Sequence, residues 1–400
     1  MKGGAHPGEM NVSNALIASR PLFDRVRKDR LGFCNEARLR REIEDAGLDA
    51  VVASSQANVI YTSGAYLAID VLPTFIVTTS SGERAAVVNE ADAVFLGTYS
   101  SIEDIRSFRF GPNSERDALA LLVALLNELG LASASLGIEL GGFSRVRLAT
   151  LEAAFAGITW ADSEPVFRNA RLVKTENEIE VLRGAARATA AAITQAFNDA
   201  DADETEKLLA ARIQSNALLG GADELSHANI NAGVHSTLGH TVSLEKQIRP
   251  EEVVHVDFGA KYGGYTSDVS RNAVMRAATP KQRDIYDRLF QIHRTLLDWL
   301  RPGLAAKEVY EKGQEEFAKV GLSYPWGTLG HSIGLVMHEG FELSAASETV
   351  LEPGMVICVE PSHIEQDDAR YDVEDMVLIR ENGTEILSLG EDISGMHVIT

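Results

Sequence analysis

Apolar and polar positions in the first part of the chain alternate between the spacings typical of helices and of strands. Helical spacing predicts one helix over 36–47, ending at Gly47, and another that Ser114 can cap and that continues through the leucine-rich stretch after it. Apolar or alternating runs predict strands at 49–54, 75–79, 84–89 and 135–140. Ser80-Ser81-Gly82 separates the middle two, which predicts a hairpin. We therefore expect a lead-in at 1–30 and an α/β domain over 31–165, in which no GxGxxG loop indicates dinucleotide binding.

The rest of the chain has a different pattern, in which long helices are separate from strand-rich stretches. Thr175 and Glu178 have the Thr-x-x-Glu spacing of a capping box before an apolar helical face. Further helices are predicted over 204–219 and from Thr279-Pro280, and strands dominate 228–276 and 350–395. This segregation indicates an α+β domain over residues 170–400.

Composition narrows the class of protein. The 400 residues suffice for two domains, and 45% hydrophobic with 24% charged residues is typical of a globular protein. A net charge of −21 disfavours nucleic acid as a partner and suits cation binding. The longest apolar-rich run, Leu119–Leu126, is well short of the ~20 residues that a membrane span needs, and the N-terminus shows no apolar signal region. Because Cys34 and Cys358 are far apart, we expect no disulfide framework and a cytoplasmic location.

Two aspartates occur on a predicted hairpin. The strand VVHVDFG carries Asp257, and the returning strand, YTSDVSR, carries Asp268. A hairpin centred between Tyr262 and Tyr265 is expected to place the two aspartates opposite each other, with Cβ atoms ~4.5–5.5 Å apart on one sheet face. Two carboxylates so placed among apolar residues require a shared proton or a cation.

A second pair of carboxylates lies near the C-terminus. The apolar strand MVICVE ends in Glu360, and the strand VEDMVLI carries Glu374, so the two strands can pair as well. The glycine-punctuated segment GHSIGLVMHEG supplies His331 and His338. Taken singly, each acid is typical of a solvated surface residue and each histidine of a core or surface group. Together, four carboxylates and neutral His331 form a five-ligand set whose charge two divalent cations balance.

These motifs resemble a known family. DFGAKYGGYTSDVSR, GHSIGLVMHEG, LEPGMVICVEP and VEDMVLI are similar to the pita-bread metallopeptidases, among them prolidase, aminopeptidase P, methionine aminopeptidase and the metal-free creatinase. The resemblance covers about 170–390, and RLVKTENEIEVLR looks like the family's first helix. Residues 38–64 resemble the N-terminal domain of creatinase and prolidase, which methionine aminopeptidases normally lack.

The resemblance implies a role for each site residue. Asp257 would be a terminal ligand of one metal, Asp268 and Glu374 would bridge two metals, and His331 and Glu360 would hold the second. It also implies that Glu360 accepts a proton from the attacking water. The same likeness assigns His240, in AGVHSTLGH, and His338 to hydrogen bonds with the substrate or the tetrahedral intermediate. Manganese is the first expectation, and cobalt, iron and zinc are compatible with the same ligand types.

The chain departs from the prolidase pattern at two positions. Prolidases and aminopeptidases P usually have His where this chain has Gly327, and Arg where it has Asp372. Arg370 lies one pair further back on the same strand face, which leaves open whether it reaches the site. The metal centre therefore resembles the family more closely than the substrate site does.

The expected activity is hydrolysis of an amide bond near the amino terminus of a dipeptide or short peptide by a homodimer. One alternative keeps the scaffold but hydrolyses a C–N or amide bond of a small amino-acid derivative, as creatinase does without metal. Another is a serine hydrolase using Ser332, because Gly330–Gly334 fits GxSxG, although the flanking residues are poor as the strand and helix that this motif needs. The last is a binding module without catalysis, which retention of all five ligands disfavours.

Overall fold

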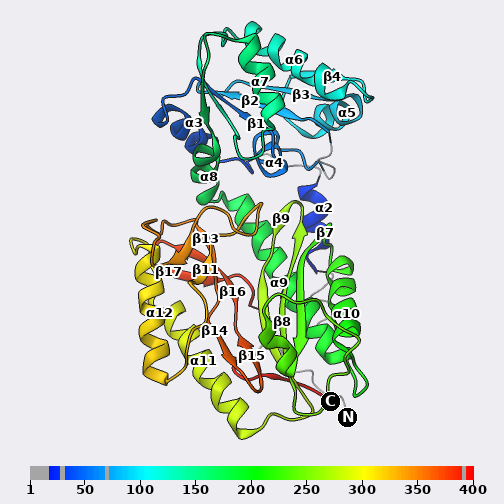
Figure 1. Ribbon diagram of the computed structural model, residues 1–400, viewed down its shortest axis with the longest axis vertical. Coiled ribbons are helices and arrows are strands. Elements are labelled where there is room, and N and C mark those ends of the chain that lie inside the picture. Colours follow the sequence, from blue (N-terminus) through cyan, green and yellow to red (C-terminus); the bar gives the residue numbers. More distant parts are fainter. Residues whose placement is uncertain (1–17, 28–31, 68–71, 390–392) are drawn as a thin grey trace, which may run out of the picture. The chain divides into compact units, whose positions relative to one another are not determined.

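The computed structural model describes residues 18–27, 32–67, 72–389 and 393–400 (Figure 1). The described residues divide into two compact units, one of them Arg25–Glu178 and the other Ile179–Thr400 together with the described N-terminal residues up to Asp24. Of the predicted lead-in, residues 1–17 and 28–30 lie outside the described residues, and Arg20–Val26 form helix α2.

The unit Arg25–Glu178 is built on a mixed six-stranded sheet in the order β4-β3-β2-β1-β5-β6. Its strands are β1 Ala50–Ala53, β2 Phe75–Thr79, β3 Arg84–Asn89, β4 Asp104–Phe108, β5 Ser135–Ile138 and β6 Thr159–Asp162. Its helices are α3 Glu36–Asp45, α4 Gln56–Ser63, α5 Glu90–Tyr99, α6 Ser114–Glu128, α7 Arg145–Ala154 and α8 Glu164–Leu172. Buried aliphatic side chains of α6 pack with those of the central strands in one core.

Most of the predicted elements of this unit are confirmed. The hairpin β2–β3 closes with a hydrogen bond from the Thr79 N–H to the Glu83 carbonyl, and Gly82 adopts a φ of 94° in the turn. The predicted cap of α6 is wrong: the N-cap is Asn113, and the Ser114 hydroxyl donates to the Gly111 carbonyl instead.

The second unit contains the strand-rich regions that the sequence predicts, flanked by helices. Its helices are α9 Glu176–Asp199, which begins at the unit boundary, α10 Glu206–Leu219, the 3-10 helix η1 Gly233–Leu238, α11 Pro280–Trp299 and α12 Ala306–Val320. Its strands are β7 Glu224–Ala232, β8 Val253–Tyr262, β9 Tyr265–Thr266, β10 Val269–Met275, β11 Thr328–His331, β12 Glu342–Ser344, β13 Val356–Val359, β14 Ser362–Glu365, β15 Ala369–Asp372, β16 Asp375–Arg380, β17 Gly383–Ile386 and β18 His397–Ile399. The capping box predicted at Thr175 forms, and Thr279 and Gln282 form another at the predicted start of α11.

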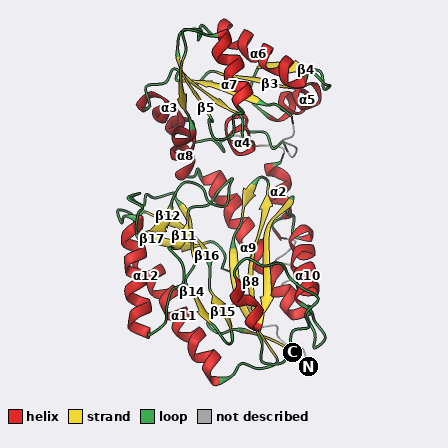
Figure 2. Ribbon diagram, in the orientation of Figure 1, coloured by secondary structure: helices red, strands yellow, loops and turns green. Residues whose placement is uncertain are grey.

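In this unit the strands lie between helices (Figure 2). The largest sheet has the order β18-β10-β8-β7, and α10 packs on β7. The sheet β13-β16-β17 and the hairpins β11–β12 and β14–β15 complete the strand layer, with α11 on β15 and β17 and α12 on β11 and β12. Strand β15 contacts β8, and β16 contacts β10, so the carboxylate-bearing strands meet in the interior. Among the described residues, no helix combines the length and hydropathy that crossing a membrane requires.

Candidate metal centre

One cavity of the second unit, about 460 Å³ in volume, brings the predicted site residues together. All of them line it: Asp257, Asp268, His331, Glu360, Glu374, His240 and His338. The five predicted ligands come from β8, from the segment before β10, from β11 and from the ends of β13 and β16, whereas His240 follows η1 and His338 lies between β11 and β12. Segments more than a hundred residues apart in the sequence therefore form one site.

The aspartate hairpin forms around the predicted centre, but the predicted pairing of the two aspartates with each other is wrong by two residues. Tyr262 pairs with Tyr265 across Gly263 and Gly264, both with positive φ, and this register continues along the strands. It places Ser270, and not Asp268, opposite Asp257. The two aspartates are thus diagonal neighbours of adjacent strands rather than a direct pair.

The glutamate strands pair antiparallel, as predicted. Val359 of β13 faces Asp375 of β16; Glu360 immediately follows Val359, and Glu374 immediately precedes Asp375. The Ser270 hydroxyl donates to Glu374 Oε2 at 2.9 Å, and this links the second carboxylate pair to the hairpin that carries the first.

His331 lies at the end of β11 with one nitrogen directed to the carboxylates. Its Nδ1 is 3.2 Å from the Ser332 carbonyl oxygen, and its Nε2 is 3.6 Å from Asp268 Oδ2. A hydrogen bond at Nδ1 fixes the imidazole tautomer that leaves Nε2 free as a ligand. Burial lowers the pKa of His331, which favours the neutral form that a metal ligand requires.

The other two predicted histidines lie at the more exposed side of the cavity. The ring of His338 stacks on that of His331 with centroids 4.0 Å apart, and its Nδ1 is 2.7 Å from Glu342 Oε1. That hydrogen bond raises the pKa of His338. His240 is exposed, and its ring centroid is 6.5 Å from that of Trp326.

The sequence reasoning missed one histidine of the cavity. His227 of β7 places Nε2 2.9 Å from Asp257 Oδ1 and 3.1 Å from Asp268 Oδ1. A signal was present, because His227, Asn229 and Asn231 alternate with smaller or apolar residues and so mark one polar face of a strand. What the sequence does not show is that this strand is the neighbour of β8.

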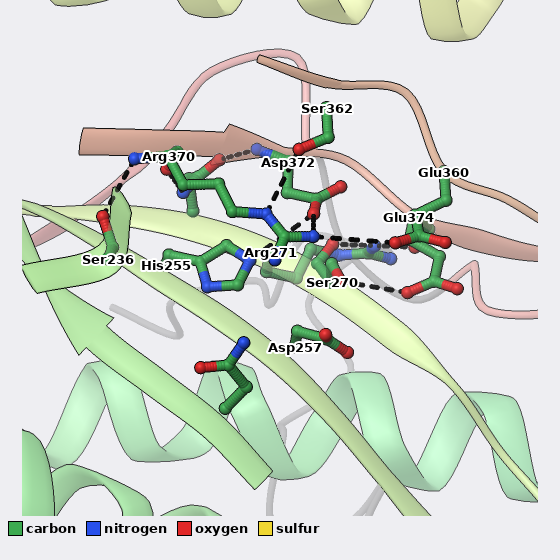
Figure 3. A network of polar contacts seen from close by, with 12 residues as sticks. Ser236, His255, Asp257, Ser270, Arg271, Glu360, Ser362, Arg370, Asp372 and Glu374 are labelled. Atoms are coloured by element: carbon green, nitrogen blue, oxygen red, sulfur yellow. Dashed lines mark hydrogen bonds and ion pairs between the residues drawn. The ribbon is translucent and has the colours of Figure 1, made fainter. Parts of the chain in front are cut away.

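Arg370 reaches the site, which settles the position that the sequence left open (Figure 3). Its Nη2 is 2.6 Å from Asp372 Oδ2 and 3.6 Å from Glu360 Oε1, and its Nε donates to the Ser362 hydroxyl. Asp372 is fully buried and lies behind the cavity wall. Strand residues two apart are ~6.6 Å apart on one face, a distance that an extended arginine spans.

Burial and repulsion between carboxylates raise the pKa values of Glu360 and Glu374. Burial, followed by the negative charges of Asp372 and Asp257, holds the pKa of Glu360 well above its usual range. Burial and the charges of Asp268 and Glu360 do the same to the pKa of Glu374. Burial also acts to raise the pKa of Asp257, but the positive charge and hydrogen bond of His227 outweigh it and hold that pKa below its usual range.

This repulsion predicts a pH-dependent stability for the metal-free protein. Folding raises the pKa of the Glu374 carboxyl from about 4.5 in the unfolded chain. Its contribution to stability is therefore fully present at a pH below 4.5, and it is lost as the pH rises toward the folded-state pKa. We expect the free energy of unfolding of the wild type, relative to Glu374→Gln, to fall as pH rises from 4.5 through neutrality. Urea unfolding in the presence of chelator measures the free energy of unfolding of both proteins at each pH. A difference between the two proteins that stays constant with pH contradicts the prediction.

The donor atoms fit divalent cations. Asp268 Oδ1 and Glu374 Oε1 are buried, and no hydrogen bond from the described residues satisfies either oxygen. Ligand atoms within 4.8 Å of one another form two groups that share Asp268: one with His227 and Asp257, the other with His331, Cys358 and Glu374. Glu360 belongs to neither group, although it lines the same cavity. Mixed carboxylate and imidazole donors of this kind suit manganese, iron, cobalt or zinc.

Ser332 does not have the setting of a nucleophile elbow. It is buried, its Oγ accepts a hydrogen bond from the Phe341 N–H, and no helix follows it within the described residues 333–341. The strand–turn–helix arrangement that the serine-hydrolase alternative requires is therefore missing in this described segment.

Known proteins resemble the chain over both units. An Xaa-Pro dipeptidase from Pyrococcus furiosus is 33% identical over 230 residues, which cover 57% of this chain and 66% of that protein, just under two thirds of its length. An uncharacterized peptidase from Bacillus subtilis is 27% identical over 362 residues, covering 88% of this chain and 96% of that protein. The solved prolidase from Pyrococcus horikoshii OT3 has a TM-score of 0.78 at 26% identity, over 89% of this chain and 98% of that chain.

Two family models match. The Creatinase/Prolidase N-terminal domain matches residues 37–173, and Metallopeptidase family M24 matches residues 180–381. The second match covers half of the chain and includes all five predicted ligands, and together the matches confirm the predicted pita-bread domain and the creatinase-type domain before it. The chain belongs to metallopeptidase family M24.

Proposed function

We propose that the protein hydrolyses an amide bond near the amino terminus of a dipeptide or short peptide, using two divalent metal ions. The observation that carries this proposal is that Asp268 belongs to both ligand groups of one cavity, with Oδ1 facing His227 and Oδ2 facing His331. A carboxylate with each oxygen toward a different set of donors suits a bridge between two ions. The Xaa-Pro dipeptidase from Pyrococcus furiosus supports the peptide substrate class.

Each ligand has a place in this proposal. Asp257 would hold one ion, His331 and Glu360 would hold the other, and Asp268 and Glu374 would serve both. Two bound ions would supply Lewis-acid polarisation of the scissile carbonyl and activation of water. Manganese is the first candidate, because four of the five donors are carboxylates.

Protein side chains handle the protons and orient the substrate. Glu360 accepts a proton from the attacking water and returns it to the leaving amine. His338, half-exposed and bonded to Glu342, donates a hydrogen bond toward the reacting carbonyl, and His240 does so from the cavity mouth. Arg370 lines the same cavity, and its guanidinium places a positive charge there that suits a substrate carboxylate.

A second candidate is hydrolysis of a C–N bond in a small non-peptide amino-acid derivative. Gly327 favours it, because this residue lines the cavity and a Cβ built there meets no atom within 4 Å. A cavity wall without the side chain that prolidases usually place there suits a substrate of different shape.

A metal assay combined with a substrate panel tests the proposal. We expect about two ions per chain, hydrolysis of at least one of Xaa-Pro, Xaa-Pro-Xaa, Met-Xaa and non-proline dipeptides, loss of activity with a chelator, and recovery with Mn²⁺. A serine-reactive phosphonate serves as the control and should leave the activity unchanged. Inactivity on every peptide with two ions bound favours the non-peptide substrate, and active protein without metal overturns the proposal.

Two further features remain predictions. We propose a homodimer, as the family resemblance implies, and sedimentation of the purified chain checks it. The cytoplasmic location rests on cysteine usage, and fractionation of the source cells checks it.

A further inference from the structure

We propose that His227 is a sixth metal ligand, which binds through Nε2 to the ion held by Asp257. This inference rests on the dinuclear site proposed above, but not on the identity of the substrate. It gives each ion one imidazole nitrogen, His227 on one and His331 on the other. The two histidines do not compete for the same ion, because they face different oxygens of Asp268.

The spacing of the three donor atoms fits a shared cation. His227 Nε2 lies 2.9 Å from Asp257 Oδ1 and 3.1 Å from Asp268 Oδ1. Neighbouring ligands ~2.1 Å from one ion are separated by about 3.0 Å in octahedral and about 3.4 Å in tetrahedral coordination. The observed separations match the octahedral value.

A hydrogen bond alone leaves the cluster incompletely satisfied. An imidazole nitrogen carries one hydrogen, and two carboxylate oxygens approach Nε2 of His227. Asp268, only 4% exposed, keeps Oδ1 without a hydrogen bond among the described residues. A cation between the three atoms satisfies both oxygens, which a single proton cannot do.

The backbone around His227 is shaped to admit its ring. Strand β7 has a register shift between Leu225 and His227, and bulges of this kind re-aim side chains next to functional sites. His227 then pairs with Gly259 of β8. A Cβ at Gly259 would lie 2.4 Å from the ring carbon Cε1 and 2.7 Å from Nδ1, so only glycine leaves room for the imidazole there.

The proposal has a consequence for metal choice. Imidazole suits zinc, iron and copper better than carboxylate does, whereas oxygen donors suit manganese and magnesium. We therefore expect the site held by Asp257 to prefer zinc to manganese, and we expect this preference to be larger in the wild type than in a His227 variant.

X-ray absorption of the zinc-loaded full-length chain tests the ligand directly. With two zinc ions bound, imidazole scattering from the wild type should correspond to one histidine per zinc on average, and His227→Gln should halve it. In Mn²⁺ titrations followed by the EPR signal of free Mn²⁺, His227→Gln should weaken one site roughly tenfold or more and leave the other unchanged. His235→Gln is the matched control, because His235 Nδ1 bonds Glu206 at 2.8 Å and does not line the cavity.

The outcomes separate this inference from the proposed function. Wild-type protein with two zinc ions but only half a histidine per zinc overturns the role of His227 and leaves the dinuclear site standing, even if the variant does not fold. Unchanged Mn²⁺ affinity in a folded His227→Gln also overturns it, since the glutamine amide replaces a hydrogen bond but not an imidazole ligand. Wild-type protein that binds no metal overturns both proposals.

Discussion

Replacing Asp268 with alanine is expected to remove both metal ions and the hydrolytic activity together. Its carboxylate is buried, and its two oxygens face the imidazoles of His227 and His331, so each ion loses a ligand when it is removed. Metal ions supply several kcal/mol of transition-state stabilisation, so kcat/KM should fall by roughly three orders of magnitude or more. Elemental analysis and activity assays on the same preparation measure the two effects.

Two further variants show whether the loss reflects bridging. Asp257→Ala should keep one ion per chain, because that carboxylate belongs to only one ligand group. Asp298→Ala, at a side chain 74% exposed on α11, should leave metal content and activity unchanged. Asp268→Ala protein that still holds two ions contradicts the bridging role, whatever its activity.

The aspartate hairpin shows how far patterning specifies a sheet. The sequence predicted both strands, their antiparallel pairing, the centre of the hairpin and the face that carries Asp257 and Asp268, but the direct pairing of the two aspartates was wrong by two residues. Strand side chains repeat with period two, so a slip of one residue moves every apolar side chain to the wrong face, whereas a slip of two keeps each on its own face. Hydrophobicity cannot distinguish these two pairings, but the position of the turn does. With Tyr262 opposite Tyr265, as the sequence indicates, Ser270 lies opposite Asp257.

The missed elements had weak local signals. Helix α12 buries Ala306, Val309, Gly313 and Phe317, so small residues occupy half of its buried face and the apolar periodicity is faint. His227 lies thirty residues before Asp257, on a strand whose neighbour only the folded sheet reveals. The five predicted ligands, by contrast, lie in compact motifs with distinctive chemistry, which is why the sequence alone could bring them together.

The position of Arg370 was predictable from the sequence only in part. Its place on the same face as Asp372 could be read from strand parity, but its contact with Glu360 depends on how the side chain is held. The ion pair with Asp372, the hydrogen bond to Ser362 and the ring of Trp326, 5.3 Å from the guanidinium carbon, fix that conformation. A positive charge thus reaches the cavity from two residues before the position where prolidases usually carry arginine.

Removing this charge is expected to destabilise the fold strongly. In Arg370→Met, Asp372 is left as a fully buried carboxylate without its main counter-ion, and Glu360 loses a nearby cation as well. Breaking a buried ion pair from one side typically costs about 3–5 kcal/mol, so the free energy of unfolding of the metal-free protein should fall by that amount. Urea unfolding at constant pH measures the change.

The double variant Arg370→Met/Asp372→Asn separates folding from substrate binding. With both members of this pair neutral, position 372 no longer carries a buried charge without its counter-ion, and most of the lost stability should return. If the guanidinium also holds a substrate carboxylate, the refolded double variant should keep its metal ions but show a raised KM for peptides with a free C-terminus. A double variant as unstable as Arg370→Met contradicts the ion-pair argument, and recovery of both stability and KM shows that Arg370 acts on Asp372 alone.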